Sequence, residues 1–221
     1  MKTWIEFANR SDFGPLVAIP DNRTLCDVGQ PLDTLWLVIH GTLERFHPTP
    51  NGEAGVVQFL RAPMLVGDFE MLAKNTHFAA GIRAATPCAG YRISRAQAER
   101  IILERPTALR ELAQAVAHSG LSSIRTSAVR LGDVETNLAM VLLSYAELFG
   151  VESIDGIRID RPLKRHHLAN AAGITVRSVN RVLKRWSDAG IATRVDRHYV
   201  VQSLPGLRAL SGDGERSLLV A

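Results

Sequence analysis

The stretch from Gly14 to Arg92 consists of short apolar runs that turn-forming residues separate from one another. The runs are PLVAIP, TLCDVG, TLWLVIHG, TLERF, GVVQFL, MLVG and AAGIRA. Short strands with frequent Pro, Gly, Asp and Asn between them are typical of antiparallel rolls and sandwiches. Helical patterns of about 10–15 residues do not alternate with these runs, which disfavours the parallel sheet of a dinucleotide-binding fold. This segment therefore predicts an antiparallel β-roll.

Helical patterns begin after Ile93. Ser94 can cap a short helix over 95–103, which Pro106 interrupts. The segment 107–131 contains no proline, and in its second half apolar or small residues recur at alternating steps of four and three. These seam residues are Ala117, Leu121, Ile124, Ala128 and Leu131. Because such heptad spacing is typical of paired helices, we expect a homodimer through this helix. The alternative is a helix that packs only on its own roll.

A further helix is expected after a break at Gly132. Asp133 is a suitable N-cap for a helix over 134–149, and Gly150 follows it in the C′ position. Residues 131–133 are therefore the expected hinge after the long helix.

The segment 163–186, LKRHHLANAAGITVRSVNRVLKRW, predicts two helices joined by a tight turn. Leu168, Ala169 and Ala172 share one face of the first helix, which Gly173 ends, and Thr175 can cap the second. The apolar positions of the second helix, at i, i+3, i+4 and i+7, are Val179, Val182, Leu183 and Trp186. This is the pattern of a helix-turn-helix.

The other face of the second helix carries side chains that suit DNA recognition. They are Val176, Arg177, Asn180, Arg181 and Lys184. Arginine and asparagine form paired hydrogen bonds with guanine and adenine edges in the major groove, and valine can contact a thymine methyl group. Thr175 and the backbone amides at that helix end are suitable for phosphates. After Gly190, IATRVDRHYVVQ predicts a hairpin with its turn near Asp196, which would add a wing.

Charge is concentrated in the same region. Residues 161–200 contain nine lysines and arginines against two acids, a net charge of +7, whereas the remainder of the chain carries −3. A basic segment on a mildly acidic protein is typical of nucleic-acid binding, and the alternative is a solvated basic surface.

The order of these elements is similar to that of the Crp/Fnr superfamily of bacterial transcription regulators, over residues 14–203. LCDVGQPLDTLWLVIHGTLERF resembles the family's roll, LGDVETNLAMVLLSYA resembles the junction after its dimer helix, and GITVRSVNRVLKRWSDAGI resembles its recognition helix. We therefore expect an α+β protein. Its parts would be an antiparallel β-roll sensor domain of the double-stranded β-helix or jelly-roll type (1–106), a dimerisation helix (107–132), a winged helix-turn-helix (133–205) and a tail (206–221).

The resemblance implies a homodimer that reads a pseudo-palindromic site in double-stranded DNA, and RNA polymerase as a partner if the protein activates transcription. It implies backbone contacts at the start of the first helix and base contacts from Val176, Arg177 and Arg181. The DNA-contacting residues expected are Lys164, Arg165, His166, Thr175, Val176, Arg177, Ser178, Asn180, Arg181 and Lys184. Val-Arg stands where many members have Arg-Glu, and residues 162–164 lack the usual Ser or Thr cap. The family's familiar operators are therefore not expected.

In cyclic-nucleotide-binding members of the family, the counterpart of VGDFEMLAKNTHFAAGIRA (66–84) holds the nucleotide phosphate. Gly67 fits this cassette and Asp68 replaces the usual Glu, but the phosphate-clamping Arg-Ser pair aligns with Phe78-Ala79. Without that cation a buried phosphate is unfavourable, so we expect no control by cyclic AMP. A pocket for an unidentified effector would comprise Gly67, Asp68, His77, Phe78, Ala79, Ser122 and Ser123. The two serines could equally be small residues of the helix seam.

Other functions find less support in the sequence. Cys26 and Cys88 are too few for an iron–sulfur cluster, a zinc site or a disulfide framework. A cupin-like metal enzyme would need a His-x-His pair, and no nucleophile elbow or Walker loop is present, so we expect no enzyme and no metal site. The alternative is a ligand-sensing module, or a haem or gas sensor that uses His77. With no apolar run of about 18 residues and no signal pattern, we expect a cytoplasmic protein without membrane contact.

Overall fold

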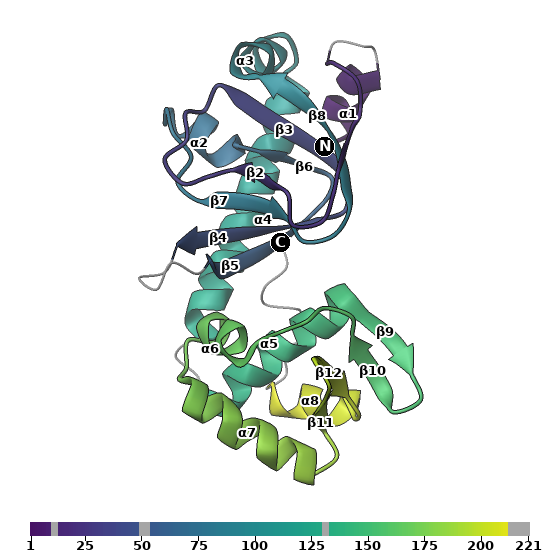
Figure 1. Ribbon diagram of the computed structural model, residues 1–221. Helices are drawn as coiled ribbons and strands as arrows, with labels where there is room; N and C mark the ends of the chain where they lie inside the picture. The colour runs from purple at the N-terminus through teal and green to yellow at the C-terminus, as the bar shows by residue number, and fades with distance from the viewer. Residues whose placement is uncertain (10–12, 49–53, 130–132, 212–221) are drawn as a thin grey trace. The chain divides into compact units, whose positions relative to one another are not determined.

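The computed structural model (Figure 1) describes residues 1–9, 13–48, 54–129 and 133–211, without the side chains of residues 9, 54, 57 and 122–129. The chain divides into two compact units, with the boundary between Leu121 and Ser122. The first contains a β-roll and most of a long helix. The second contains a helix-turn-helix with a small sheet.

The roll is built from two antiparallel four-stranded sheets, as the short apolar runs predict. One sheet has the order β1-β8-β3-β6 and the other the order β2-β7-β4-β5. The strands are β1 (Val17–Ile19), β2 (Thr24–Cys26), β3 (Thr34–His40), β4 (Thr42–Pro48), β5 (Ala54–Arg61), β6 (Met64–Val66), β7 (Gly81–Ala84) and β8 (Cys88–Ser94). The predicted runs did not include β8, although it pairs with both β1 and β3.

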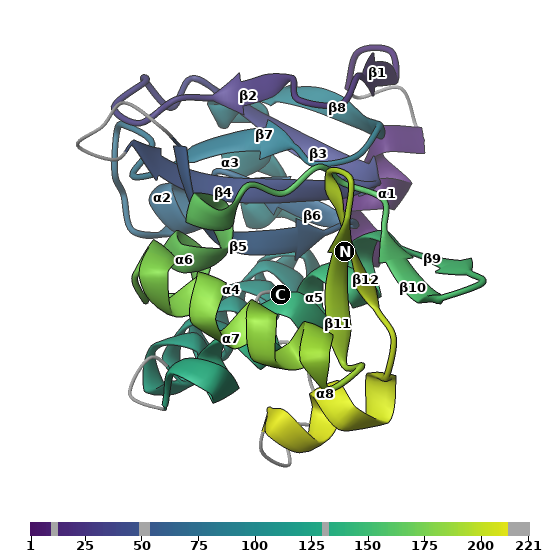
Figure 2. The same ribbon diagram turned by 60° about the horizontal axis from the view of Figure 1, so that its bottom comes forward.

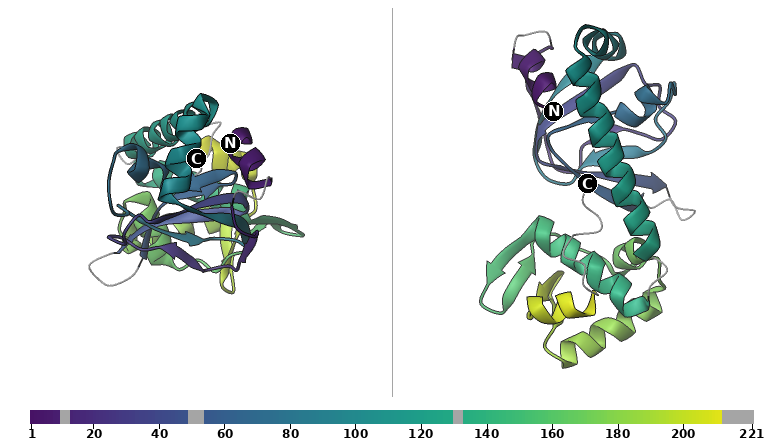
Figure 3. Two further views of the ribbon diagram at one scale, coloured as in Figure 1. Left: turned by 90° about the horizontal axis from the view of Figure 1, so that it is seen from above. Right: turned by 180° about the vertical axis from the view of Figure 1, so that it is seen from behind.

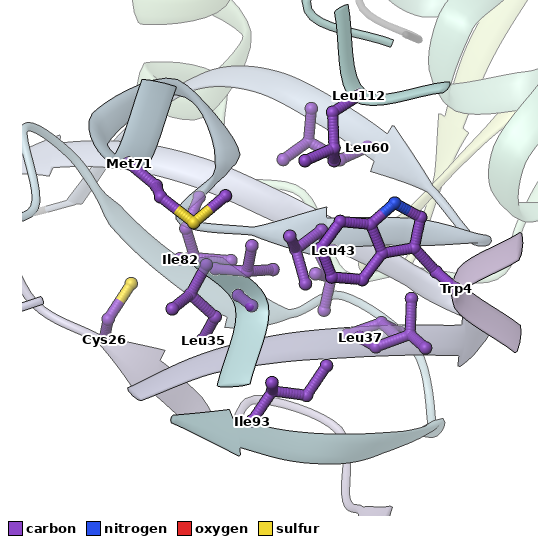
Figure 4. Close-up of a cluster of buried hydrophobic side chains, with 14 of the residues drawn as sticks. Trp4, Cys26, Leu35, Leu37, Leu43, Leu60, Met71, Ile82, Ile93 and Leu112 are labelled. Carbon is purple, nitrogen blue, oxygen red and sulfur yellow. The ribbon is translucent and has the colours of Figure 1, made fainter. Parts of the chain in front are cut away.

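Alternation along the strands places the apolar core between the two sheets. Leu35 and Leu37 of β3 and Leu43 of β4 are fully buried, and they converge in Figure 4 with Trp4. Trp4 belongs to α1 (Lys2–Asn9), a helix that the sequence did not predict. Its indole nitrogen donates a 3.1 Å hydrogen bond to the carbonyl oxygen of Ala108, which ties α1 to the long helix.

The roll unit also contains α2 (Asp68–Leu72), α3 (Arg95–Glu104) and the long α4 (Pro106–Val129) as far as Leu121. The predicted cap of α3 is confirmed, because the Ser94 side chain accepts from the Gln97 amide in a capping box. The right-hand view of Figure 3 shows the first part of α4 lying along the roll. Its buried face includes Ala108 and Leu112.

The second unit is a winged helix-turn-helix. Its helices are α5 (Val134–Phe149), α6 (Arg165–Ala172), α7 (Val176–Asp188) and α8 (Leu204–Leu210). Its strands are β9 (Gly150–Ser153), β10 (Gly156–Ile159), β11 (Ala192–Val195) and β12 (His198–Val201), in the antiparallel order β11-β12-β10-β9. Figure 2 shows α7 in the foreground with the β11–β12 hairpin beside it. The hairpin turns at Asp196, whose φ is 54°, as predicted.

The structure differs from the sequence prediction at two places in this unit. Gly150 is the C-cap of α5, but its backbone is extended and it begins β9, whose hairpin with β10 was not predicted. The boundary expected at residue 206 falls inside α8, whose Leu207 is fully buried. Burial of Leu207 makes 206–210 part of the winged-helix unit and not a tail, while 212–221 lie outside the described residues.

Candidate nucleic-acid interface and the interior of the roll

Helix α7 begins at a side-chain cap, and its amphipathic sequence determines which face it buries. The Thr175 hydroxyl accepts a 3.1 Å hydrogen bond from the Ser178 amide, as the sequence predicted. Val179, Val182 and Trp186 are buried. Gly173, at φ 67°, makes the left-handed turn that separates α7 from α6. The helix is therefore anchored along one face.

The opposite face of α7 is exposed to solvent and basic. Its exposed side chains are Val176, Arg177, Asn180, Arg181 and Lys184, with Val176 41% exposed. Ser178 is half-buried against the cap. Within the described residues no salt bridge engages Arg177 or Arg181, so both guanidinium groups have their donors free for a partner. The structure brings these expected DNA-contacting residues together on one surface.

Glu135 on α5 holds the carboxyl end of α7. Its carboxylate accepts from the Arg185 guanidinium at 2.9 Å and from the Trp186 indole nitrogen at 2.7 Å. Glu135 lies next to the predicted cap of α5, since the Asp133 carboxylate accepts from the amides of Thr136 and Glu135 at 2.9 and 2.8 Å. These two hydrogen bonds lower the pKa of Asp133. The first turn of α5 therefore positions the recognition helix, a role that sequence reasoning missed.

The start of α6 presents two of the three basic residues expected there. Lys164 is the N-cap, without a side-chain cap hydrogen bond, as the missing Ser or Thr predicted. Lys164 and Arg165 are exposed, whereas His166 is half-buried with its ring 4.3 Å from the ring of His167. His166 therefore differs from the other two in its access to a partner.

A hollow of about 390 Å³ lies between α6, α7 and the hairpin, and we call it the wing hollow. Its lining residues are Arg165, Asn180, Leu183, Lys184, Ser187, Thr193, Arg194 and Tyr199. Arg194 and Tyr199 were not among the expected DNA-contacting residues. Arg194 nevertheless lies in the predicted wing, two residues before the turn.

In the roll, the cassette keeps its glycine and its acid but is closed by an aromatic ring. Gly67 has φ 96°, and a Cβ there would lie 2.9 Å from Leu32 and 3.3 Å from the Phe78 ring. Phe78 is buried, whereas His77 and Ala79 are exposed. The structure therefore does not gather the expected pocket residues around one space. The side chains of Ser122 and Ser123 lie outside the described residues.

Asp68 is a buried acid, only 8% exposed, at the start of α2. Its carboxylate accepts a 2.8 Å hydrogen bond from the Phe69 amide. Burial raises its pKa to about 6, although that hydrogen bond and the positive charge of Arg45 act in the opposite direction.

The cation near Asp68 comes from a strand and not from the cassette. Arg45 of β4 donates a 2.8 Å hydrogen bond to Gln58 of β5 and lies over the Phe69 ring at 5.1 Å. Burial lowers its pKa, while the charges of Asp68 and Glu70 raise it. The Gln58 amide in turn reaches the Ser119 hydroxyl on α4 at 3.5 Å. The interior of the roll thus holds a polar chain from α2 to α4 that sequence reasoning missed.

A second buried charge lies nearby. Glu44 is fully buried and forms a salt bridge with Arg83, which lies over the Phe46 ring at 5.2 Å. Burial raises the pKa of both cysteines, that of Cys26 to about 12, so both are thiols at neutral pH. Among the described residues no cluster of three His, Cys, Asp or Glu could hold a metal ion. No helix in the described ranges is long and apolar enough to span a membrane.

Two domain families match the chain in succession. Residues 16–105 match the cyclic nucleotide-binding domain and residues 137–210 match the Crp-like helix-turn-helix domain. The protein belongs to the Crp/Fnr family. The Crp/Fnr resemblance and the α+β fold predicted from the sequence are thereby confirmed.

Relatives of this Crp/Fnr protein are transcriptional regulators. The cAMP-activated global transcriptional regulator CRP of Escherichia coli O157:H7 is 23% identical over 184 residues, 82% of this chain and 87% of CRP. The global nitrogen regulator of Synechococcus elongatus is 27% identical over 166 residues, 73% of each chain. The family and its helix-turn-helix make this protein a DNA-binding regulator.

Solved structures show the same fold. A CRP-family regulator from Thermus thermophilus superposes with a TM-score of 0.76 at 17% identity, over 91% of this chain and 99% of that one. The c-di-GMP-responsive global regulator CLP of Xanthomonas campestris gives 0.77 at 17% identity, with the same coverage. CRP is thus described as cAMP-activated and CLP as c-di-GMP-responsive, so members of this family respond to different ligands.

Proposed function

We propose that this Crp/Fnr-family protein binds a pseudo-palindromic DNA site as a homodimer and regulates transcription without cyclic AMP. The observation that carries the proposal is the division of α7 into a buried apolar face and an exposed basic face. Val179, Val182 and Trp186 fix the helix to its unit, and the outer face offers Arg177 and Arg181 to solvent. An anchored helix with free bidentate donors is suited to reading base edges in the major groove.

The homodimer is supported by an apolar stripe on α4 that the roll does not cover. Leu109 is 41% and Leu121 is 54% exposed, and Ala113 and Ala117 between them are also exposed. Each lies four residues after the one before it, so they follow one side of the helix, next to the face that carries the buried Leu112. A second copy is the partner that two-fold symmetric operators require. Of the expected seam, Leu131 and the side chains of Ile124 and Ala128 lie outside the described residues.

A direct test of the dimer is the Leu121→Glu variant. A charge in the middle of an apolar seam is unfavourable, so we expect a monomer by sedimentation and loss of binding to the full site. Leu103→Glu is the matched control, because Leu103 is 83% exposed on α3, outside the stripe. A Leu121→Glu protein that still sediments as a dimer would remove this helix from the interface.

Independence from cyclic AMP is supported by the interior of the roll. Phe78 stands in the phosphate-clamping position, and Arg45, the cation that acts on Asp68, is already engaged by Gln58 and by the Phe69 ring. A cyclic nucleotide would have to place its phosphate beside the buried Asp68 carboxylate, which is electrostatically unfavourable. The polar chain from Arg45 to Ser119 links the interior of the roll to α4 through the protein's own side chains.

The proposed function is tested by selecting binding sites from a random duplex library with the full-length protein, with and without cyclic AMP. We expect an inverted repeat with half-sites about one helical turn apart, enriched equally in both arms. If a site is enriched only with cyclic AMP, the proposal that the protein acts without cyclic AMP is wrong. If no site is enriched in either arm, the proposal of sequence-specific DNA binding is wrong. An added arm with small molecules from cell extract tests the sensing alternative that the buried Asp68 and Arg45 favour. RNA polymerase recruitment to the selected site then separates activation from repression.

A further inference from the structure

A hollow of about 610 Å³ lies on the roll, apart from the cassette, and we call it the β1–β2 hollow. It is lined from both sheets, by β1, β3 and β8 of one and by β2 of the other, together with the connections on either side of β2. None of the cassette residues 66–84 lines it. Its volume falls within the range of about 300–1,000 Å³ that small-molecule sites occupy. Neither base reading nor the cassette accounts for this space.

Backbone hydrogen bonds hold the two connections that wall the β1–β2 hollow. On the connection from β1 to β2, the carbonyl oxygen of Arg23 accepts from the Ala84 amide at 2.9 Å. On the connection from β2 to β3, the carbonyl oxygen of Gln30 accepts from the Phe78 amide at 2.9 Å. Because both connections are tied to other parts of the roll, the hollow is preformed, and a ligand does not have to order its walls on binding.

Trp36 gives the hollow an aromatic wall. It alternates along β3 with the buried Leu35 and Leu37, so its side chain lies on the face of the sheet opposite the core, where it is half-buried. Arg92 lies directly opposite Trp36 on β8, and its guanidinium group is 5.7 Å from the centroid of the Trp36 ring. Leu25 of β2 adds apolar surface to the lining. An indole ring with an apolar neighbour favours a ligand that carries an aromatic ring.

The charged residues of the hollow favour an anion. Arg23 and Arg92 contribute two guanidinium groups and Asp33 contributes one carboxylate, which leaves a net charge of +1. All three side chains are exposed, and no salt bridge engages them within the described residues. The planar guanidinium fork matches a carboxylate and forms paired hydrogen bonds with it. One carboxylate balances the excess charge, whereas a phosphate dianion would exceed it and be repelled by Asp33.

We propose that the β1–β2 hollow binds a small aromatic carboxylate, with its ring against Trp36 and its carboxylate on the guanidinium groups of Arg92 and Arg23. Asp33 disfavours a second acidic group on the ligand and can accept a hydrogen bond from a hydroxyl or amino substituent. The inference does not depend on the proposed DNA-binding function, because every residue that carries it belongs to the roll unit.

Titration of the full-length protein with benzoate, phenylacetate and phenylpropionate tests the site through tryptophan emission. Of the three tryptophans, Trp4 and Trp186 are 0% and 1% exposed, so a change in emission on binding reports on Trp36. We expect at least one of these acids to give a saturable change, phenethylamine to bind about tenfold more weakly, and acetate to give no change. If none of the acids gives a saturable change, the proposal is wrong. Equal binding of phenethylamine would overturn the role of the arginines.

The Trp36→Phe variant locates the ligand. Phenylalanine keeps an aromatic surface in the hollow, so we expect calorimetry to detect binding of the same acid while the emission change disappears. An emission change that persists in this variant would place the ligand near Trp4 or Trp186, and therefore outside the hollow.

The Arg92→Gln variant tests the charge. We expect the acid to bind about tenfold more weakly, because a charge-assisted pair of hydrogen bonds is lost. The melting temperature should not change, since Arg92 is exposed. Arg100→Gln is the matched control, because Arg100 is an exposed arginine of the same unit that does not line the hollow. If Arg92→Gln binds the acid as the wild type does, or if Arg100→Gln weakens binding as much, the carboxylate does not contact Arg92 and the assignment is wrong.

Discussion

The β-roll and the outer face of α7 both carry charged side chains, but the roll buries its carboxylates whereas α7 exposes its charges to solvent. Glu44 and Asp68 are buried, with Arg83 and Arg45 as their cations. On α7, Arg177 and Arg181 are exposed to solvent and have no salt-bridge partners among the described residues. A buried charge is committed to its internal partner, whereas a solvated one remains available. The charged groups of the roll are therefore enclosed within the fold, and those on the outer face of α7 remain available to a partner.

The Glu44→Ala variant should give the largest effect on stability. It leaves the half-buried Arg83 guanidinium without the fully buried carboxylate that it pairs with. Breaking a buried pair from one side costs about 3–5 kcal/mol, and we expect a loss of about 4 kcal/mol in urea unfolding. Glu104→Ala is the control, since it breaks the exposed Arg100–Glu104 pair and should change stability by less than about 0.5 kcal/mol. Equal losses of stability in the two variants would mean that the buried ion pair contributes no more than the exposed one.

The Asp68→Asn variant should stabilise the protein at neutral pH. The folded state keeps the Asp68 proton up to about pH 6, while the unfolded chain releases it near 3.8. The folded state binds more protons between these values, so this group's contribution to stability falls as pH rises from about 4 to 6 and stays low above that. Asparagine keeps an acceptor for the Phe69 amide and removes the charge. We expect a gain of about 2 kcal/mol at pH 7.

Urea unfolding from pH 4 to pH 8 checks this expectation. The gain from Asp68→Asn should shrink as pH falls below 6, because the wild-type carboxyl is then neutral as well. A gain that is constant across the series, or a loss at pH 7, would mean that Asp68 is ionised and well paired in the fold.

The Arg181→Ala variant should leave stability unchanged and relax base preference at one position in each half-site. One bidentate contact accounts for about 2 kcal/mol of discrimination. Site selection with the variant protein gives the base frequencies, and the Arg165→Ala variant serves as the comparison, because a phosphate contact should weaken all sequences alike. If the Arg181→Ala variant keeps the base preference of the wild type at every position, Arg181 does not read a base.

The smallest expected effect is that of Glu135→Gln. The amide oxygen can still accept from Trp186, but the charge on Arg185 loses its partner, so we expect a loss of about 1 kcal/mol in DNA affinity. Glu135→Ala, which removes both hydrogen bonds, should shift the emission of Trp186 as well. If both variants bind DNA as the wild type does, α5 does not position the recognition helix.

The helix-turn-helix could be predicted from the sequence because its determinants are local. Thr175 caps the residues directly after it, Gly173 makes its own turn, and Asp133 accepts from the amides of the next turn. Each of these signals involves residues that are close together in the sequence, so it can be recognised without knowing the fold.

The interior of the roll could not be predicted in the same way. Arg45 meets Gln58 because β4 and β5 pair in one register, and the two lie opposite each other across the sheet. Nothing in either strand alone indicates that pairing, and a shift by one residue would turn Arg45 to the other face. Tyr199 is a similar case, since the charges that act on it come from Arg165 of α6 and Arg194 of β11. The cassette residues were found by alignment to the family, but Phe78 filling the space beside Gly67 is a matter of packing.

The division of α7 into an anchored face and a free face also bears on how such a protein can evolve. Val176, Arg177, Asn180 and Arg181 take no part in the core, so exchanging them should alter folding stability by no more than about 0.5 kcal/mol. A new operator can therefore be acquired through single substitutions that leave the scaffold intact. Descendants of one ancestor can come to govern different genes while Val179 and Trp186 stay as they are.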